Sequence, residues 1–163
     1  MPKSKPEGTP VETCAESVQI AKSGAHQFPI WVPKDAAAYP DRVAYISGPM
    51  RGKPGSNFPA FDECRESLLA DGWYVVSPAD IDRMHGFFGF EPVSDQERRG
   101  FLCRDIAIIC DPIITDIVLL PEWAGSKGAQ IERSVGEALD LTFHDWSPRM
   151  GLWNTRRGNN AAL

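Results

Sequence analysis

The sequence predicts a single α/β domain built on a parallel β-sheet. Between residues 43 and 143, short runs of β-branched and aromatic residues alternate with segments that carry apolar residues at helical spacing. Apolar runs without polar alternation are typical of strands that helices cover on both faces. Strands that alternate with helices favour parallel pairing, because each helix returns the chain to the same edge of the sheet. We therefore expect a flavodoxin-like (Rossmann-like) three-layer sandwich with a parallel sheet of four to five strands.

The expected strands are short, and each ends near glycine, proline, serine or another turn residue. They cover residues 43–47, 73–76, 117–120 and 141–143. The expected helices cover residues 57–71, 94–110 and 127–139. Residues 79–93 combine two glycines and a proline with three phenylalanines. We expect this segment to be irregular and either to cover a pocket or to pack on a partner.

The domain is expected to span residues 43–144, between two further zones. In the N-terminal extension, residues 1–42, a capping-box pattern precedes apolar residues at helical spacing and predicts a short helix over about residues 11–21. Residues 28–33 are expected to pack across the domain as an extended segment. The C-terminal tail, residues 145–163, docks on its own domain, reaches a neighbouring subunit or frays.

The composition argues against several classes of function. Hydrophobic residues (42%) and charged residues (24%) have ordinary globular values. The net charge of −5 offers no basic surface for a nucleic-acid polymer, although a few local donors can hold one phosphate. No apolar run could cross a membrane or act as a leader, so we expect a soluble, cytoplasmic protein. The cysteines and histidines have no metal-ligand spacing, so we expect reduced, mostly buried thiols and neither metal nor cofactor.

The turn after the first strand is a candidate phosphate site, because ligands of parallel α/β sheets bind beyond the carboxyl ends of the strands. The turn reads Gly48-Pro49-Met50-Arg51-Gly52-Lys53. Its backbone amides, including those of Gly48 and Gly52, and the Arg51 side chain could hold a phosphate. The alternative is an ordinary turn with solvated cations.

A second candidate anion site follows the strand at residues 117–120. Ser126 stands where a helix N-cap is expected, so its hydroxyl and the first free amides, near Gly128, could bind an anion. Glu132 lies early in this helix, where the macrodipole favours the carboxylate form. Its neighbours at helical spacing are small or apolar and leave room for a ligand. The alternative is a glutamate that only complements the macrodipole.

Asp105 is a second unusual carboxyl group. Its neighbours at helical spacing are apolar, so desolvation is expected to raise its pKa. The alternative is a buried aspartate tied to Arg104 or to a backbone amide. Two carboxyl groups with opposed environments suit chemistry at an anomeric carbon: the ionised one attacks, and the other helps the departing base take a proton. Tyr45, on the first strand, could hydrogen-bond the attacking group.

These segments together resemble the nucleoside 2-deoxyribosyltransferase superfamily over roughly residues 43–143. The similar segments are Tyr45-Ile46-Ser47-Gly48-Pro49-Met50-Arg51-Gly52, Arg104-Asp105-Ile106, Asp116-Ile117-Val118-Leu119-Leu120 and Ser126-Lys127-Gly128-Ala129-Gln130-Ile131-Glu132, in the family's order. They are most similar to a branch common in bacteriophages and their hosts, which carries Pro-x-Trp-x-x-Ser-x-Gly-Ala-x-x-Glu. No Gly-x-Ser-x-Gly, Walker or Gly-x-Gly-x-x-Gly motif competes with this interpretation.

The resemblance implies a role for each matching residue. Glu132 matches the glutamate that forms a glycosyl-enzyme intermediate, and Asp105 and Tyr45 match residues of the 2′-deoxynucleoside 5′-monophosphate N-glycosidases. The residues expected to hold the substrate and its 5′-phosphate are Gly48, Arg51, Gly52, Ser126 and Gly128. Two departures are present: Pro49 replaces a serine, and the interval from Asp105 to Glu132 is longer than in the family. The second departure leaves Asp116 as an alternative acid and substrate contact.

The expected function is therefore hydrolysis of the N-glycosidic bond of a (deoxy)nucleoside 5′-monophosphate. Arg51 favours this reaction, because enzymes that act on free nucleosides have little use for a cation at that position. Base exchange by a deoxyribosyltransferase and a non-catalytic nucleotide sensor are the alternatives. The resemblance also implies a homodimer or higher homo-oligomer in the cytoplasm of a bacterium or a phage-infected cell.

Overall fold

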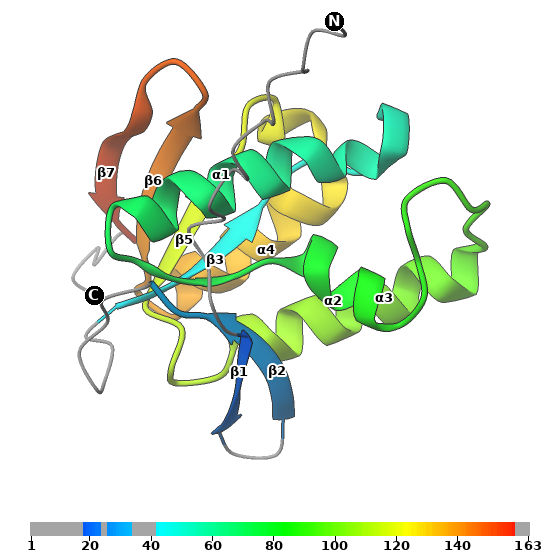
Figure 1. Cartoon of the computed structure of the whole chain (residues 1–163), viewed down its shortest axis with the longest axis horizontal. Coiled ribbons are helices and arrows are strands. Elements are labelled where there is room, and N and C mark those ends of the chain that lie inside the picture. Colours follow the sequence, from blue (N-terminus) through cyan, green and yellow to red (C-terminus); the bar gives the residue numbers. More distant parts are fainter. Residues whose placement is uncertain (1–17, 24–25, 34–41, 159–163) are drawn as a thin grey trace, which may run out of the picture.

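The computed structural model describes residues 18–23, 26–33 and 42–158 and contains one β-sheet with helices on both faces (Figure 1). The strands are β1 (Val18–Ser23), β2 (His26–Trp31), β3 (Val43–Ser47), β4 (Tyr74–Val76), β5 (Asp116–Leu119), β6 (Thr142–Ser147) and β7 (Gly151–Arg157). The α-helices are α1 (Phe58–Ala70), α2 (Pro78–Met84), α3 (Asp95–Ile109) and α4 (Lys127–Ala138), and the short 3-10 helices are η1 (Pro54–Asn57) and η2 (Trp123–Gly125). The prediction of an α/β protein is confirmed.

The sheet is mixed rather than purely parallel. Its strand order is β1-β2-β4-β3-β5-β6-β7. The four central strands, β4, β3, β5 and β6, are parallel and correspond to the predicted strands. The β1–β2 hairpin adds antiparallel strands at one edge, and β7 pairs antiparallel with β6 at the other (Figure 1). The expected parallel sheet of four to five strands is thus only the centre of a seven-stranded sheet.

The edge strands come from segments placed outside the expected domain. Residues Val18–Ser23 were expected to continue the N-terminal helix, but they form β1, because their backbone pairs with β2. The remainder of that predicted helix lies outside the described residues. Strand β2 is extended as expected, and its Phe28 and Ile30 are buried. At the other end, β6 crosses the expected boundary between residues 144 and 145, and β7 docks the described part of the tail on its own domain.

Two apolar cores fill the space between the sheet and the helices. On one face, α1 packs Phe58, Phe61, Cys64 and Leu68 against alternate residues of the central strands, including Ile46. On the other face, Ile108 and Ile109 of α3 and Val135 of α4 pack against the remaining residues, including Tyr45 and Ile117. Successive strand residues point to opposite faces, so Tyr45 faces α3 and α4. These two helices carry the candidate carboxyl groups.

Two local expectations need correction. The segment 79–93 is not irregular throughout, because α2 begins at Pro78 and extends to Met84; proline in the first turn is compatible with a helix. Of the described cysteines, Cys64 is buried, whereas Cys103 and Cys110 are exposed, because the buried face of α3 is formed by other residues. Within the described ranges, no helix is long and apolar enough to cross a membrane.

Candidate active site

The carboxyl ends of β3 and β5 lie next to the start of α4. We call this end of the parallel strands the carboxyl edge of the sheet. Ser47 and Leu119 are paired in register, so the two strands end at the same level. The Ser126 hydroxyl accepts a hydrogen bond from the amide of Ala129 at 3.3 Å and caps α4, as predicted. Helix α4 therefore starts at this edge and places Glu132 within its second turn.

Glu132 is buried and receives two hydroxyl donors from β3. The Tyr45 hydroxyl lies 3.4 Å from Oε1, and the Ser47 hydroxyl donates to Oε2 at 2.5 Å. Tyr45 and Ser47 are two residues apart on a strand, so their side chains share a face. The structure brings together the predicted Tyr45 and Glu132 and adds Ser47.

A half-buried arginine, Arg104, links two further carboxyl groups beside Glu132. Arg104 donates from Nε and Nη2 to Oδ1 of Asp105, at 2.9 and 2.7 Å. Its third donor, Nη1, reaches Oδ1 of Asp82 on α2 at 2.7 Å. Asp105 lies on the buried face of α3, as predicted, and it is also tied to Arg104, as the alternative interpretation held. Asp82 is almost completely buried.

Burial dominates the ionisation of this cluster. Burial, followed by the charge of Asp105, raises the pKa of Glu132 to about 8, although the hydrogen bonds from Ser47 and Tyr45 oppose this rise. Burial raises the pKa of Asp105 to about 7 against the opposing charge of Arg104. Burial also raises the pKa of Asp82, again opposed by Arg104. Burial and the neighbouring carboxyl groups raise the pKa of Tyr45 well above its ordinary value.

The expected contrast between the two carboxyl environments is wrong. Sequence analysis predicted an ionised Glu132 at a helix N-terminus and a desolvated Asp105, but both groups are buried and both pKa values are raised. The macrodipole is a modest influence, of about 1 kcal/mol near a helix end, whereas desolvation of a carboxyl group is larger. At neutral pH the pair therefore retains at least one proton, and the higher pKa of Glu132 places it mainly on that residue, although the two hydroxyl donors favour the carboxylate form.

A pocket of about 240 Å³ adjoins this cluster, and Asp82 belongs to both. Its other lining residues come from the turn after β3, from η1, from the segment between α2 and α3, and from α3: Met50, Arg51, Gly52, Ser56, Phe87, Glu91, Val93, Arg98 and Phe101. The predicted alternative that residues 79–93 cover a pocket is confirmed for Phe87. Phe88 and Phe90 are instead exposed, at 55% and 84%.

The pocket walls are fixed by close backbone approaches. A Cβ atom on Gly89 would lie 2.6 Å from the carbonyl oxygen of Gly55, so only glycine allows the two loops to touch. The Ser56 hydroxyl donates to the Gly89 carbonyl at 3.0 Å and joins the same loops. The Phe87 and Phe101 rings lie 5.6 Å apart and form an aromatic wall.

The predicted phosphate-binding residues lie around the same edge. Arg51 and Gly52 line the pocket, and Arg51 is exposed and forms no ion pair with a described residue. Lys53 is instead paired with Glu122. A Cβ atom on Gly48 would lie 2.7 Å from Leu120, so this glycine allows the turn to pack on the end of β5. A Cβ atom on Gly128 would meet only the Ser126 hydroxyl, at 3.9 Å, which leaves open space beside Glu132's helix.

Asp116 does not lie in this cluster. It pairs with Ala44 and Thr142 at the amino ends of the parallel strands, three residues before Leu119 at the carboxyl end of β5. This corresponds to about 10 Å along the strand. Its carboxyl group accepts hydrogen bonds from His144 at 2.8 Å and from Arg42 and Thr115. Asp116, the predicted alternative acid, therefore lies at the amino ends of the parallel strands, away from Glu132, and has its own contacts.

Sequence analysis missed Ser47, Asp82 and Arg98. Ser47 could have been found, because the strand period of two places it beside Tyr45. Asp82 carried no signal while its segment was taken as irregular. Arg98 looks like a solvated helix residue in sequence, and its guanidinium pairs with Asp95 at 2.7 Å, but it also lines the pocket.

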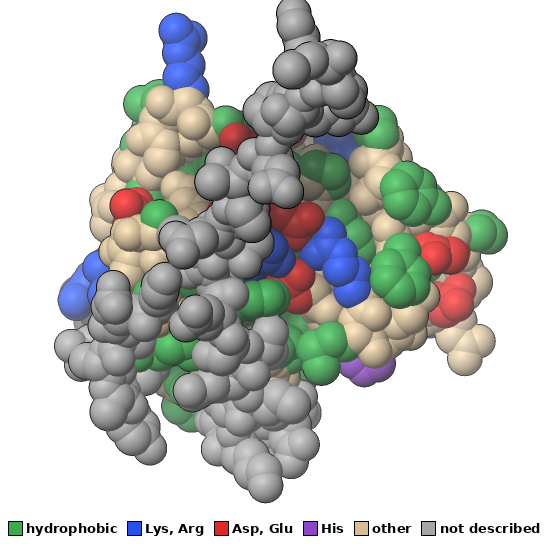
Figure 2. Space-filling view, viewed as in Figure 1, with side chains coloured by type: hydrophobic (Ala, Val, Ile, Leu, Met, Phe, Trp, Pro, Cys, Tyr) green, Lys and Arg blue, Asp and Glu red, His purple; other side chains and the backbone are tan. Residues whose placement is uncertain are grey.

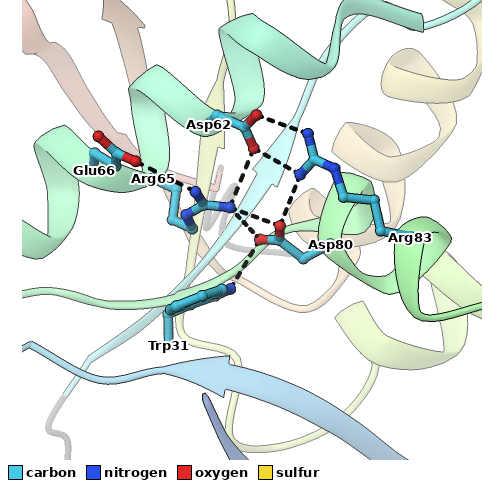
Figure 3. Close-up of polar contacts among 6 residues, drawn as sticks. All are labelled: Trp31, Asp62, Arg65, Glu66, Asp80 and Arg83. Carbon is cyan, nitrogen blue, oxygen red and sulfur yellow. Dashed lines mark hydrogen bonds and ion pairs between the residues drawn. The ribbon is translucent and has the colours of Figure 1, made fainter. Parts of the chain in front are cut away.

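A second charged network fastens α2 to α1 (Figure 3). Asp80 of α2 accepts hydrogen bonds from Arg65 at 2.6 and 2.8 Å and from the Trp31 indole at 2.8 Å. Arg83 of α2 donates to both carboxylate oxygens of Asp62 at 2.7 Å. Charged side chains of both signs are also visible side by side at the centre of the face in Figure 2. Helix α2 is thereby fixed on both sides, with Asp82 directed toward Arg104.

These features define an α/β protein with buried carboxyl groups and a partly cationic pocket at the carboxyl edge of its parallel strands. Residues 42–144 match the model of a family described as a domain of unknown function (DUF4406), and the chain belongs to that family. Comparisons with curated proteins and with solved structures find no match. Among the residues that the structure describes, no group of three or more histidine, cysteine, aspartate or glutamate side chains could hold a metal ion.

Proposed function

We propose that the chain hydrolyses the N-glycosidic bond of a (deoxy)nucleoside 5′-monophosphate and releases free base and sugar 5-phosphate. The observation that carries this proposal is Glu132: it is buried at the carboxyl edge of the sheet, oriented by two hydroxyl donors, and coupled to a second protonatable carboxyl group. Such a pair can divide the roles of nucleophile and acid at an anomeric carbon. The resemblance to nucleoside 2-deoxyribosyltransferases supports the same chemistry.

In the proposed first step, a carboxylate oxygen of Glu132 forms a bond to C1′ while the C1′–N bond breaks. The electron pair of that bond leaves with the base, which takes the proton of Asp105. In the second step, the oxygen of a water molecule bonds to C1′, the ester bond to Glu132 breaks, and a proton of the water returns to Asp105. The cycle requires a carboxylate on Glu132 and a proton on Asp105, so we expect the proton that the coupled pair retains near neutrality to move from Glu132 to Asp105 when the substrate binds.

Arg51 is the proposed phosphate-binding cation. It lines the pocket, and no described carboxylate forms an ion pair with it, so its donors are free for an anion. The backbone of Gly48 and Gly52 and the capped start of α4 at Ser126 and Gly128 lie around the same edge and would supply further donors. The central four strands, with helices on both faces, support a flavodoxin-like origin of the fold within the mixed sheet.

Base exchange is a second candidate, because it uses the same covalent intermediate. The burial of Glu132 favours it, since a buried ester is shielded from water and has time to meet an acceptor base. A free base added to the reaction would then yield a new nucleotide. The homo-oligomer and the cytoplasmic location implied by the resemblance stay predictions.

The proposal is tested by incubating the protein with a panel of nucleosides and their 5′-monophosphates and separating released base by chromatography. We expect base release from monophosphates and little from nucleosides. Glu132→Gln should abolish release while leaving the dissociation constant of the nucleotide almost unchanged. Glu137→Gln, on the outer side of the same helix, is the matched control and should remain active. Full activity of Glu132→Gln, or tight binding to the wild-type protein without any base release, would contradict the proposal.

A further inference from the structure

Asp82 has a carboxylate oxygen without a partner at the pocket. Its side chain is 2% exposed, and Arg104 engages only Oδ1. Among the described residues, no hydrogen bond reaches Oδ2. Oδ2 is not among the fully buried polar atoms that lack a partner, so a small part of it is open, and a ligand that covers it must supply a donor or leave it unsatisfied at a cost. Because Asp82 lines the pocket, a donor group on a bound ligand would satisfy this oxygen.

The walls beside Asp82 suit a planar ring. The Phe87 ring stands edge-on to Phe58 at 5.9 Å and tilted to Phe101 at 5.6 Å. The amide of Phe87 donates to the carbonyl of Asp82 at 3.0 Å, so the aromatic wall and the carboxylate are joined through one turn of backbone. Arg104 lies 5.4 Å above the Phe101 ring and fixes both that ring and Asp82. Aromatic walls of this kind favour stacking with planar ligands.

Cations occupy another part of the pocket lining. Arg51 comes from the turn after β3 and Arg98 from α3, and both line the pocket. Arg98 is oriented by Asp95, and the charge of Arg51 contributes less than Arg98 does to lowering the pKa of Asp95. The pocket thus combines an anion-binding part, an aromatic part and one buried acceptor.

We propose that Asp82 accepts a hydrogen bond from the exocyclic amine of the base, so that the preferred substrates are nucleotides of amino-bearing bases. This inference rests on the proposed function of the site and names its substrate class. A base with a carbonyl group at that position would place its oxygen against the carboxylate, leaving Oδ2 unsatisfied and adding repulsion. Sites that hydrogen-bond a ligand group discriminate strongly against analogues that lack it.

The test compares nucleotides that differ only in this group: deoxycytidine with deoxyuridine 5′-monophosphate, and deoxyadenosine with deoxyinosine 5′-monophosphate. Dissociation constants are measured by calorimetry on the full chain carrying Glu132→Gln, so that turnover does not interfere. We expect the amino member of at least one pair to bind about tenfold to a hundredfold more tightly, as for a hydrogen bond to a charged group. Equal binding within both pairs would overturn the proposal, and this comparison needs no substitution of Asp82.

Asp82→Asn in the same background identifies the residue responsible. Its side-chain amide can donate, so the preference should disappear or reverse. Glu91→Gln is the matched control, because Glu91 also lines the pocket but is exposed, and the preference should persist. An equal loss of affinity for all four nucleotides in Asp82→Asn would instead assign Asp82 to the sugar and overturn the proposal, as would unchanged binding of all four.

The two proposals fail separately. A preference for amino-bearing nucleotides without base release from the wild-type protein would refute the glycosidase activity and retain the role of Asp82. Base release with equal binding within each pair would refute the role of Asp82 and retain the glycosidase activity.

Discussion

At the scale of single residues, the state of Glu132 depends on a balance between burial and hydrogen bonding. Burial and the charge of Asp105 raise its pKa, whereas the hydroxyl groups of Ser47 and Tyr45 lower it by donating to the carboxylate. The proposed nucleophile must be ionised to attack C1′. Ser47, which donates at 2.5 Å, is therefore a positioning residue that also determines how much carboxylate is present.

Ser47→Ala should raise the pKa of Glu132, because it removes a donor to the charged form. At acidic and neutral pH, kcat/KM should fall about tenfold for a rise of about one unit in that pKa, because less of Glu132 is ionised while Asp105 keeps its proton. Rates should converge with those of the wild-type protein at high pH. Ser134→Ala is the control, because that hydroxyl bonds only to the backbone of its own helix. A loss of equal size at every pH, alkaline pH included, would show that Ser47 does not act through the ionisation of Glu132.

Some of these residues could be predicted because their signals are local. Glu132 follows a recognisable N-cap, and Asp105 interrupts an apolar helix face. The ionisation of Glu132 could not be predicted in the same way, because it depends on β3 and α3, which approach it only in the folded protein. The position of a residue in a helix predicts how the macrodipole affects its pKa, but it does not predict how desolvation affects it.

At the scale of elements, α2 connects the pocket to the rest of the fold. Asp80 and Asp82 are two residues apart on this helix and point to different arginines. Asp80 faces the network with Arg65 and Arg83 (Figure 3). Asp82 faces Arg104. The first contact fixes the helix on α1, and the second reaches the site. The sequence of α2 carries three charges in seven residues and no apolar period, so its helical state is stabilised by these tertiary ion pairs.

Asp80→Ala should destabilise the protein strongly, by about 3 kcal/mol, because it leaves Arg65, whose side chain is only 11% exposed, without its main partner. The midpoint of urea unfolding, followed by circular dichroism, measures this change. Glu66→Ala removes a side chain that is 67% exposed and only 3.5 Å from the same arginine, so its effect should stay below about 0.5 kcal/mol. Similar effects of the two substitutions would mean that the network does not fix α2.

At the scale of the whole molecule, the two ends of the central strands carry different groups: the candidate site lies at the carboxyl ends, and a stabilising ion-pair network lies at the amino ends. Their carboxyl ends hold the pocket and carboxyl groups with raised pKa values. Their amino ends hold Asp116, for which burial opposes ionisation but hydrogen bonds from His144, Arg42 and Thr115 outweigh it and lower the pKa. The alternation of strands and helices predicted this frame. The edge strands could not be predicted, because β1 and β7 are specified by pairing with β2 and β6 rather than by their own periodicity.

Asp116→Asn should therefore reduce stability while preserving base release. The lowered pKa means that the unfolded chain binds a proton more readily than the native one, so this carboxylate stabilises the fold above its unfolded pKa and the stabilisation is lost as the pH falls through its native pKa. At pH 7 the substitution should cost about 1–3 kcal/mol, seen as a lower Tm. The difference from the wild-type protein should shrink on acidification below the unfolded pKa, as the wild-type carboxyl group takes up its proton. Normal kcat/KM in this variant, beside a strong loss in Asp105→Asn, would assign the acid to the carboxyl edge. A loss of turnover in Asp116→Asn with unchanged Tm would reverse that assignment.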